Sequence, residues 1–221
     1  MIHPVIIGPK TRLAQELIAQ LSQRSNEFAQ ATIVARNESE GIALQSQFPH
    51  SAVVDCSQAL PPCAPQRLAL FVCALGPVKA RIEGESRQVI SALDREVTCI
   101  QHLLSRQPHD ALSLIFVSSV LAWSSEVNRF VYSGAKRLGE SALRDVASEH
   151  LASTFSAIYP GRLVAERRWS KPTTLLATRY SEAAELMLNL VLKKPQTCII
   201  GRDARLLLIR GWLANCLPWT H

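Results

Sequence analysis

The sequence predicts an α/β fold, a doubly wound parallel sheet of about seven strands between two layers of helices. Short β-branched, apolar runs alternate with longer helical stretches along the chain. The strand runs are almost continuously apolar rather than alternating, which indicates a sheet covered on both faces. The chain has 221 residues, 48% of them apolar, which is enough for one core, so we expect residues 1–221 to form a single domain.

The strands are expected at short apolar runs rich in β-branched residues, and the helices at the longer stretches between them. The predicted strands are Val5–Ile7, Ala31–Ala35, Ala52–Asp55, Leu68–Cys73, Leu114–Val117, Phe155–Tyr159 and Thr197–Ile200. The predicted helices are Leu13–Leu21, Glu38–Phe48, Glu85–Leu104, a helix that carries Tyr132 and Lys136 and runs to about Leu151, and Tyr180–Leu192. A proline-rich connection at residues 61–65 leads to the fourth strand.

The composition excludes several classes of protein. The net charge is +6, but the basic residues are scattered without a run of five, so no nucleic-acid partner is indicated and anionic small molecules suit the charge equally well. The six cysteines form no C-x-x-C pair and have no histidine at zinc spacing, so we expect small buried side chains and no metal. There is no signal peptide and no apolar stretch of eighteen residues, which predicts a cytoplasmic protein without stable membrane insertion.

The candidate catalytic residues are Ser119, Tyr132 and Lys136. Tyr132 and Lys136 are four residues apart in a helical stretch, so they share one helix face, where the cation can stabilise a phenolate. Ser119 closes an apolar run thirteen residues earlier, and its hydroxyl at a strand end can bind the same oxygen. These groups together can move a proton to or from a carbonyl or alcohol, although a surface Tyr and Lys on an amphipathic helix is the alternative.

A candidate nucleotide-binding turn follows the first strand. Gly8 fits the first glycine of such a turn, where the backbone must turn tightly before a helix whose N-terminus accepts phosphate. Thr11 and Ala14 occupy the other two glycine positions, and Lys10 and Arg12 add positive charge nearby. An ordinary strand-to-helix loop explains these residues equally well, and the β-branched Thr11 stands where phosphate should approach.

Further candidates stand at the ends of the next strands. Arg36 follows the second strand, where an arginine favours a 2′-phosphate and therefore NADP over NAD. Asp55 closes the third strand and would accept a hydrogen bond from an adenine amino group. Ala74, Leu75 and Gly76 follow the fourth strand and would let a cofactor lie close to the backbone. Each signal is weak alone, but the four successive strand ends share one edge of the sheet.

With these motifs the sequence resembles the short-chain dehydrogenase/reductase family over nearly the whole chain. Ser119, Tyr132 and Lys136 match its Ser and Tyr-x-x-x-Lys set, and Pro160-Gly161 matches the Pro-Gly that flanks the nicotinamide. The segments 73–76 and 93–95 look more like its atypical branch. The resemblance implies one NAD(P)-binding domain of Rossmann type, an NADP cofactor and hydride transfer to or from a small carbonyl or alcohol.

The resemblance also implies a role for each residue. Tyr132 would be the general acid in reduction, and Lys136 would hold the nicotinamide ribose and lower the Tyr132 pKa. Ser119 would orient the substrate oxygen. The family often has an Asn that supports a proton relay, and Asp94 lies near that position in this chain.

Two segments near the C-terminus complete the expectations. Residues 162–173 should form the substrate lid, whose Arg167, Arg168, Trp169 and Lys171 would meet an anionic or aromatic substrate or else form a solvated basic loop. The tail from Gly201 is apolar at Leu206, Leu207, Ile209, Trp212, Leu213 and Leu217. Packing of this tail on the core is the first expectation, a homo-oligomer interface the second, and weak membrane contact the third.

Two other functions stay open at this point. One is a non-redox isomerase or dehydratase on the same scaffold that uses Tyr132 and Lys136. The other is a non-catalytic binding or regulatory protein that senses the dinucleotide, or has lost it, and keeps the Ser-Tyr-Lys set only as a remnant. The intact Ser-Tyr-Lys set favours an enzyme, whereas the altered glycine turn favours the binding protein.

Overall fold

The computed structural model describes residues 1–55, 58, 67–75, 86–106, 109–123, 130–168, 170–171, 174–193 and 195–216, with the backbone alone for residue 86 and residues 210–216. Seven parallel strands form one sheet in the order β3-β2-β1-β4-β5-β6-β9. They are β1 (Ile2–Ile7), β2 (Thr32–Ala35), β3 (Ala52–Asp55), β4 (Arg67–Val72), β5 (Ala111–Val117), β6 (Ser153–Pro160) and β9 (Cys198–Ile200). The predicted doubly wound sheet of seven strands is confirmed.

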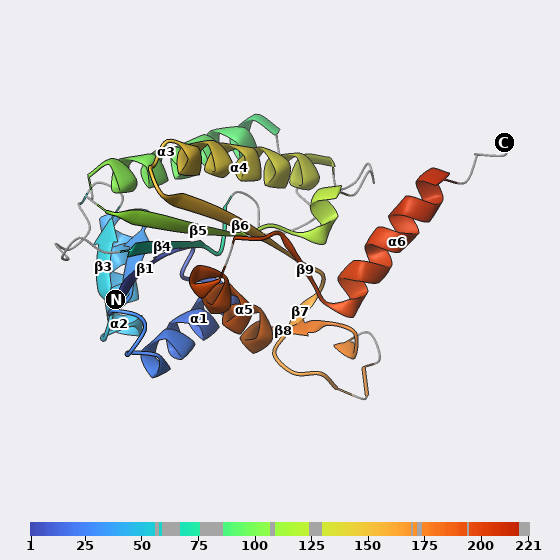
Figure 1. Cartoon of the computed structure of the whole chain (residues 1–221), viewed down its shortest axis with the longest axis horizontal. Coiled ribbons are helices and arrows are strands. Elements are labelled where there is room, and N and C mark those ends of the chain that lie inside the picture. The colour runs from blue at the N-terminus through green and yellow to red at the C-terminus, as the bar shows by residue number, and fades with distance from the viewer. Residues whose placement is uncertain are drawn as a thin grey trace.

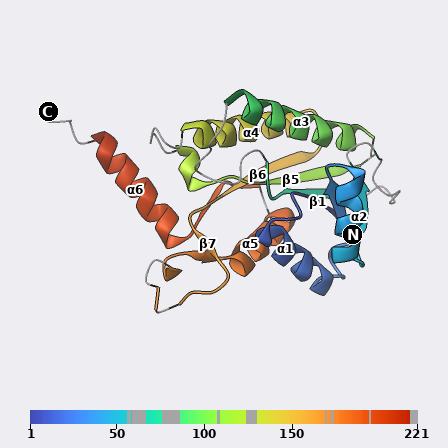
Figure 2. The same ribbon diagram turned by 180° about the vertical axis from the view of Figure 1, so that it is seen from behind.

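Helices cover both faces of this sheet (Figure 1). The helices are α1 (Arg12–Gln23), α2 (Glu38–Gln47), α3 (Ser86–Ser105), α4 (Phe130–Ser148), α5 (Tyr180–Leu192) and α6 (Arg202–Cys216), with a short 3₁₀ helix η1 at Val120–Trp123. Helices α3 and α4 pack together over one face, and α1 and α5 pack together over the other, as the view from behind also shows (Figure 2). The result is the predicted three-layer sandwich.

The core consists of two apolar layers, one on each side of the sheet. Ile6 of β1 packs in the layer with α1 and α5, whereas its neighbours Val5 and Ile7 pack in the layer with α3 and α4. Because successive side chains of a strand point to opposite faces, both must be apolar in a strand covered on both sides. This explains the continuous apolar runs of the sequence.

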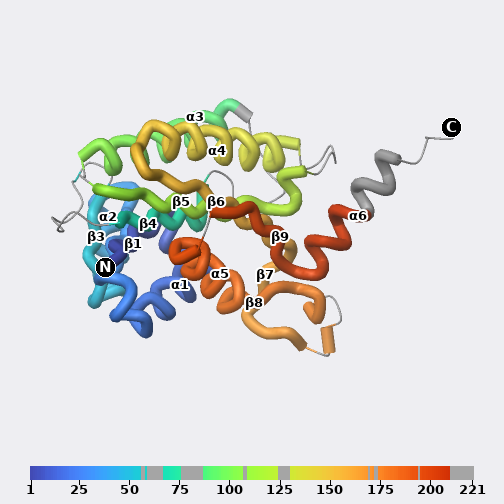
Figure 3. Tube along the Cα trace, viewed as in Figure 1, coloured from blue at the N-terminus to red at the C-terminus, as the bar shows by residue number. Residues whose placement is uncertain are grey.

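Three segments differ from the sequence-based expectations. Helix α4 ends at Ser148 rather than near Leu151, since Ala152 has a positive φ of 55° before β6 begins. A two-stranded parallel sheet of β7 (Leu163–Val164) and β8 (Thr178–Arg179) lies within the expected lid. The apolar tail forms α6, which leaves the main body of the molecule (Figure 3).

The first expectation for the tail, that it packs on the core, is wrong for the side chains that the structure describes. Leu206, Leu207 and Ile209 are 53%, 44% and 54% exposed, whereas Ala204 in the first turn of α6 is buried. Trp212, Leu213 and Leu217 lie outside the described side chains. Within the described residues, no helix is long and apolar enough to cross a bilayer.

The cysteines also depart in part from expectation. Cys73 is a buried free thiol and Cys198 a half-buried one, as expected for small apolar side chains. Cys99 of α3, however, is disulfide-bonded. The expectation of small buried thiols therefore holds for Cys73 and Cys198 but not for Cys99.

Candidate active site

The parallel register brings the predicted site residues to one edge of the sheet. Ala35 pairs with Asp55, Ile7 with Val72, and Val117 with Ile158, so the carboxyl ends of these strands lie side by side. The segments that follow them carry Gly8, Arg36, Ala74 and Ser119, and Pro160 ends β6. Ligands of open α/β sheets bind at this edge.

Ser119 and Tyr132 are brought together at this edge. Ser119 follows β5, and its Oγ accepts a hydrogen bond from the Leu121 N–H at 3.2 Å, which fixes the start of η1. Ser133 of α4 donates to the Leu121 carbonyl at 2.7 Å and ties α4 to the same turn. Ser119 and Tyr132 are both buried and share a side-chain hydrogen bond.

Burial raises the pKa of the Tyr132 hydroxyl, and the hydrogen bond with Ser119 opposes this shift without cancelling it. The phenol is therefore protonated at neutral pH. The expected lowering of the Tyr132 pKa by Lys136 is not found in this structure, where the Lys136 Nζ lies 5.8 Å from the centroid of the Tyr132 ring. A protonated phenol can donate a proton, as the general acid of a carbonyl reduction must.

Lys136 is the most deeply buried lysine side chain of the site, with 5% of the residue exposed. Its Nζ donates to the Leu75 carbonyl at 3.2 Å, so α4 contacts the segment after β4. Burial lowers the pKa of Lys136 to about 8, although the charge of Glu96 acts in the opposite direction. The ammonium remains mostly protonated at pH 7 and loses its proton as the pH rises through about 8.

The turn after β1 explains the altered glycine pattern. Gly8 has a φ of +76°, and a Cβ there would lie 2.7 Å from the Ala74 Cβ, so only glycine fits. Thr11 has an extended backbone at φ −72°, which suits any residue, and its Oγ1 accepts from the Ala14 N–H at 3.2 Å as the N-cap of α1. The side chain of Thr11 therefore begins the helix. Ala14 is fully buried, as a small residue at the third position should be.

The N-terminus of α1 is free of negative charge in its first turn. Arg12 stands at its first position, with its guanidinium 5.6 Å from the Tyr180 ring centroid. A helix N-terminus with neighbouring cations attracts phosphate.

A charge cluster not predicted from the sequence joins the turn after β1 to the end of β2. Glu40 of α2 accepts from the Arg36 guanidinium at 3.0 and 3.2 Å and from the Arg36 backbone N–H at 2.7 Å. The same carboxylate pairs with the Lys10 Nζ at 2.8 Å. These bonds, chiefly those from Arg36, lower the pKa of Glu40 to about 2. Glu40 is buried, whereas the side chains of Lys10 and Arg36 are 57% and 69% exposed.

The remaining predicted cofactor residues are placed as follows. Asp55 ends β3 and its Oδ1 accepts from the Gln58 N–H at 3.2 Å. Gly76 lies outside the described residues. Pro160 ends β6, and Gly161 lies against the Asp203 carboxylate, which a Cβ at Gly161 would approach to 2.5 Å. Asp203 also accepts from the Arg162 N–H at 2.6 Å, so the start of α6 is fixed to this turn.

A second group missed by the sequence analysis lies on the face of α4 that carries Tyr132 and Lys136. Glu140, one turn beyond Lys136, accepts a hydrogen bond from the Tyr159 hydroxyl and pairs with Arg144 at 3.1 Å. The Tyr159 ring stacks on Trp123 with ring centroids 4.2 Å apart. The pKa of the Tyr159 hydroxyl is raised, mainly by burial and secondly by the hydrogen bond to Glu140. The spacing of Tyr132, Lys136 and Glu140 at every fourth residue is the signal that would have found Glu140.

The described basic residues of the expected lid bind separate partners and do not converge on one site. Arg167 pairs with Glu182 at 2.7 Å and donates to the Ala177 carbonyl, whereas Arg168 lies 3.8 Å from Glu166. Trp169 lies outside the described residues, and Lys171 is exposed. In the residues that the structure describes, no three His, Cys, Asp or Glu side chains gather as metal ligands.

Comparisons with known proteins identify the fold. No family model and no curated protein sequence matches the chain. A short-chain dehydrogenase/reductase structure of the glucose/ribitol dehydrogenase type from Brucella melitensis is similar, with a TM-score of 0.65 and 16% identity over 91% of this chain and 95% of that one. Acetoin dehydrogenase from Salmonella typhimurium is similar with a TM-score of 0.64 and 18% identity, over 93% of this chain and 97% of that one. A short-chain dehydrogenase/reductase from Vibrio parahaemolyticus has a TM-score of 0.59 and 14% identity, over 92% of this chain and 100% of that one. The chain therefore has the Rossmann-type fold of the short-chain dehydrogenase/reductase structures.

Proposed function

We propose that residues 1–221 act as one NAD(P)-binding domain, an NADP-dependent oxidoreductase that reduces a small carbonyl compound. One observation carries the proposal: the hydrogen-bonded pair of Ser119 and Tyr132 lies with the buried Lys136 at the strand edge that also holds a positive-φ glycine turn. The similar structures named as dehydrogenases support an oxidoreductase.

The residues at this edge fit a dinucleotide by their chemistry. The turn at Gly8 and the N-terminus of α1, with Arg12 beside it, would hold the diphosphate. Asp55 would face the adenine, and Lys136, Leu75 and the Pro160-Gly161 turn would border the nicotinamide ribose. When bound, the reduced nicotinamide supplies the hydride for the carbonyl carbon.

Each catalytic side chain then has one task. The Tyr132 hydroxyl, kept protonated by its raised pKa, donates its proton to the carbonyl oxygen as an alcohol forms. The Ser119 hydroxyl holds that oxygen beside Tyr132. The Lys136 ammonium stabilises the phenolate that remains, and its own burial strengthens this interaction because the site has a low dielectric.

The preference for NADP depends on the charge cluster of Lys10, Arg36 and Glu40. Two exposed cations stand against one buried carboxylate, so the cluster keeps one excess positive charge. Their donors can turn to a 2′-phosphate without leaving Glu40 unpaired, because its carboxylate also accepts from the Arg36 backbone. An arginine at this position favours the phosphate-bearing cofactor.

Titration of the purified protein with NADPH and with NADH, followed by nicotinamide fluorescence, tests the cofactor. We expect NADPH to bind more tightly than NADH. Arg36→Glu should weaken NADPH by at least tenfold and leave NADH nearly unchanged, since only NADPH carries the phosphate. Absence of binding of both cofactors would refute the oxidoreductase, and equal losses would refute the role of Arg36.

NADPH oxidation with a panel of small ketones and aldehydes tests the chemistry. Tyr132→Phe should lower turnover by about 10²–10⁴-fold while NADPH binding stays within about twofold. Tyr180→Phe is the matched control because Tyr180 lies on α5, away from Ser119, and the ring under Arg12 is kept. Turnover retained in Tyr132→Phe would show that another group donates the proton, and NADPH binding without any turnover would favour a regulatory protein.

A further inference from the structure

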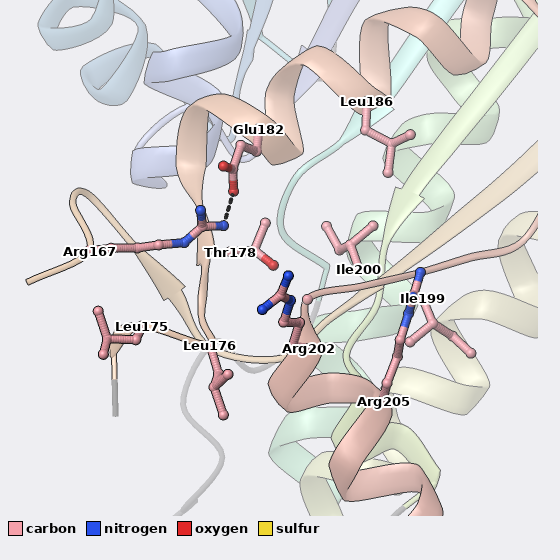
Figure 4. Close-up of a pocket in the computed structure, with 11 residues that line it drawn as sticks. Arg167, Leu175, Leu176, Thr178, Glu182, Leu186, Ile199, Ile200, Arg202 and Arg205 are labelled. Carbon is pink, nitrogen blue, oxygen red and sulfur yellow. Dashed lines mark hydrogen bonds and ion pairs between the residues drawn. The ribbon is translucent and has the colours of Figure 1, made fainter. Parts of the chain in front are cut away.

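An open cavity of about 550 Å³ lies at the outer edge of the sheet, between the expected lid, the start of α5, β9 and α6. We call it the β8–α6 pocket, since Thr178 of β8 and Arg202 of α6 face the same space within it (Figure 4). Leu175, Leu186, Ile199 and Ile200 give it apolar walls. Its volume is in the range of about 300–1,000 Å³ that small-molecule sites occupy.

The pocket has an excess of positive charge. Arg167, Arg202 and Arg205 line it, against a single carboxylate from Glu182. Glu182 is already engaged by Arg167 at 2.7 Å and by Arg179 at 3.0 Å. Arg202 and Arg205 have no carboxylate partner among the side chains that the structure describes. Two guanidinium groups are thus available to a ligand.

A buried hydroxyl without a partner points to the same ligand. Thr178 is 5% exposed, and its Oγ1 has no hydrogen-bond partner among the described residues. A Cβ at Gly201 would lie 2.6 Å from this oxygen, so only glycine fits beside the hydroxyl. A buried hydroxyl left without a hydrogen bond destabilises the fold, and a ligand oxygen that accepts from it would recover that cost.

The start of α6 adds a third favourable feature. Arg202 occupies the first position of this fifteen-residue helix, whose N-terminus carries partial positive charge. The one acidic residue of the turn, Asp203, is held by the Arg162 and Ala204 N–H groups at 2.6 and 2.9 Å. Its carboxylate thus lies against the turn at Gly161.

The β8–α6 pocket is separate from the candidate active site. None of its lining residues is Ser119, Tyr132 or Lys136, and none belongs to α1 or α4. Glu182 and Leu186 of α5 line it and are four residues apart, hence on one helix face. Tyr180, which contacts Arg12 of α1, is on the opposite side of the same helix.

We propose that the β8–α6 pocket is a second ligand site that binds a small amphipathic anion. Arg202 and Arg205 hold a carboxylate or phosphate head, and the Thr178 hydroxyl donates to one of its oxygens. The aliphatic part lies against the apolar wall of Leu186 and Ile199. This site operates with or without the proposed reductase chemistry, since it uses none of the same residues.

Isothermal titration of the cofactor-free protein tests the proposal, with octanoate and octyl phosphate below their critical micelle concentrations and 1-octanol below its solubility limit. We expect both anions to bind with a stoichiometry of one and octanol at least tenfold more weakly, because charge-assisted hydrogen bonds hold the head. The tighter of the two anions identifies a carboxylate or a phosphate as the preferred head. If octanol binds as tightly as the two anions, or if no probe binds saturably, the proposal is overturned.

Variants place the binding in the pocket. Arg202→Gln and Arg205→Gln should each weaken the preferred anion about tenfold, and Thr178→Val, which has nearly the same shape, by severalfold. Arg95→Gln, on the exposed side of α3, is the matched control and should leave affinity unchanged. Unchanged affinity in both arginine variants overturns the proposal even if Thr178→Val fails to fold. Competition between octanoate and NADPH would assign the binding to the nucleotide site instead, which also overturns it.

Discussion

Lys136 and Glu40 are both buried charges at the same edge of the sheet, but their surroundings differ. Glu40 accepts bonds from two cationic side chains and a backbone N–H, which lower its pKa to about 2. Lys136 donates to one backbone carbonyl, and burial lowers its pKa to about 8. A lowered pKa means that folding favours the charge of Glu40 and disfavours that of Lys136.

The two shifts therefore contribute to stability with opposite signs. From 4.5 to about 2 for Glu40 and from 10.5 to about 8 for Lys136, each corresponds to about 3 kcal/mol at 1.36 kcal/mol per pKa unit. The Glu40 contribution stabilises the fold at neutral pH and is lost as the pH falls towards 2. The Lys136 contribution is a cost below pH 8 that disappears as the pH rises towards 10.5. The end of the edge that holds Lys136 therefore carries an electrostatic cost that the end with Glu40 does not.

The largest expected effect is that of Lys136→Met. Turnover should fall by at least about 100-fold, because the phenolate of Tyr132 loses its cation. The free energy of unfolding at pH 7 should rise by about 2 kcal/mol, since the buried charge is removed at the loss of one hydrogen bond to Leu75. Urea denaturation measures this gain, which should shrink as the pH approaches 10.5.

The exposed Lys193 provides the control for that experiment. Lys193→Met should change the free energy of unfolding by less than about 0.5 kcal/mol. A Lys136→Met protein less stable than the parent at pH 7 would contradict the comparison, because it would mean that the Leu75 bond outweighs burial.

Glu40→Gln should have the opposite effect on stability. The amide leaves Lys10 and Arg36 without a countercharge, so we expect a loss of about 2 kcal/mol at pH 7, less than the full shift because both cations are exposed to solvent. The loss should be complete above about pH 4.5 and fade as the pH falls towards 2. Chemical denaturation across pH 2.5–7 measures it. Glu38→Gln, exposed in the same helical turn, should show no such pH dependence.

The pH dependence of kcat/KM for ketone reduction separates Lys136 from Tyr132. The rate should fall above about pH 8, by about tenfold near pH 9, as Lys136 loses its proton. Tyr132 does not account for this limb, because its pKa is raised. Lys136→Arg keeps its charge and should move the limb to higher pH if it retains activity. A limb that stays near pH 8 in this variant would assign it to another group.

The smallest expected effect on stability is that of a substitution at Thr11, in the turn after β1. Thr11→Val removes the N-cap hydroxyl of α1 but keeps the shape, and should cost about 1 kcal/mol of unfolding free energy. Thr11→Ser keeps the cap, and its free energy of unfolding should lie within a few tenths of a kcal/mol of that of the parent protein. Equal stability of the valine variant would show that the Ala14 N–H finds another acceptor.

Much of this fold could be predicted from the sequence, because its strands and helices have clear periods. Helix α5 was placed at its observed bounds, and the other predicted elements overlap the observed ones, since a buried parallel strand needs apolar residues on both faces. The two-residue strands β7 and β8 are too short to show any period.

The candidate site was predictable only where one element carries the pattern. Tyr132 and Lys136 share a helix and could be paired from their spacing, whereas Glu40 gained its role from Lys10 and Arg36, which come from other segments. The backbone of Thr11 explains why glycine is absent there, since Thr11 caps α1 in an extended conformation that any residue can adopt. The orphan hydroxyl of Thr178 has no signature in the sequence.

The contact between Gly8 and Ala74 has a consequence for the length of any molecule that spans this edge. Gly8 follows β1 and Ala74 follows β4, so their contact joins the half of the sheet that carries Arg36 to the half that carries Ser119. This contact sets the distance between the two halves at this edge of the sheet. A bulkier side chain at position 74 would increase that distance. A ligand that bridges both halves would then fit neither end, although every residue that contacts the ligand is unchanged.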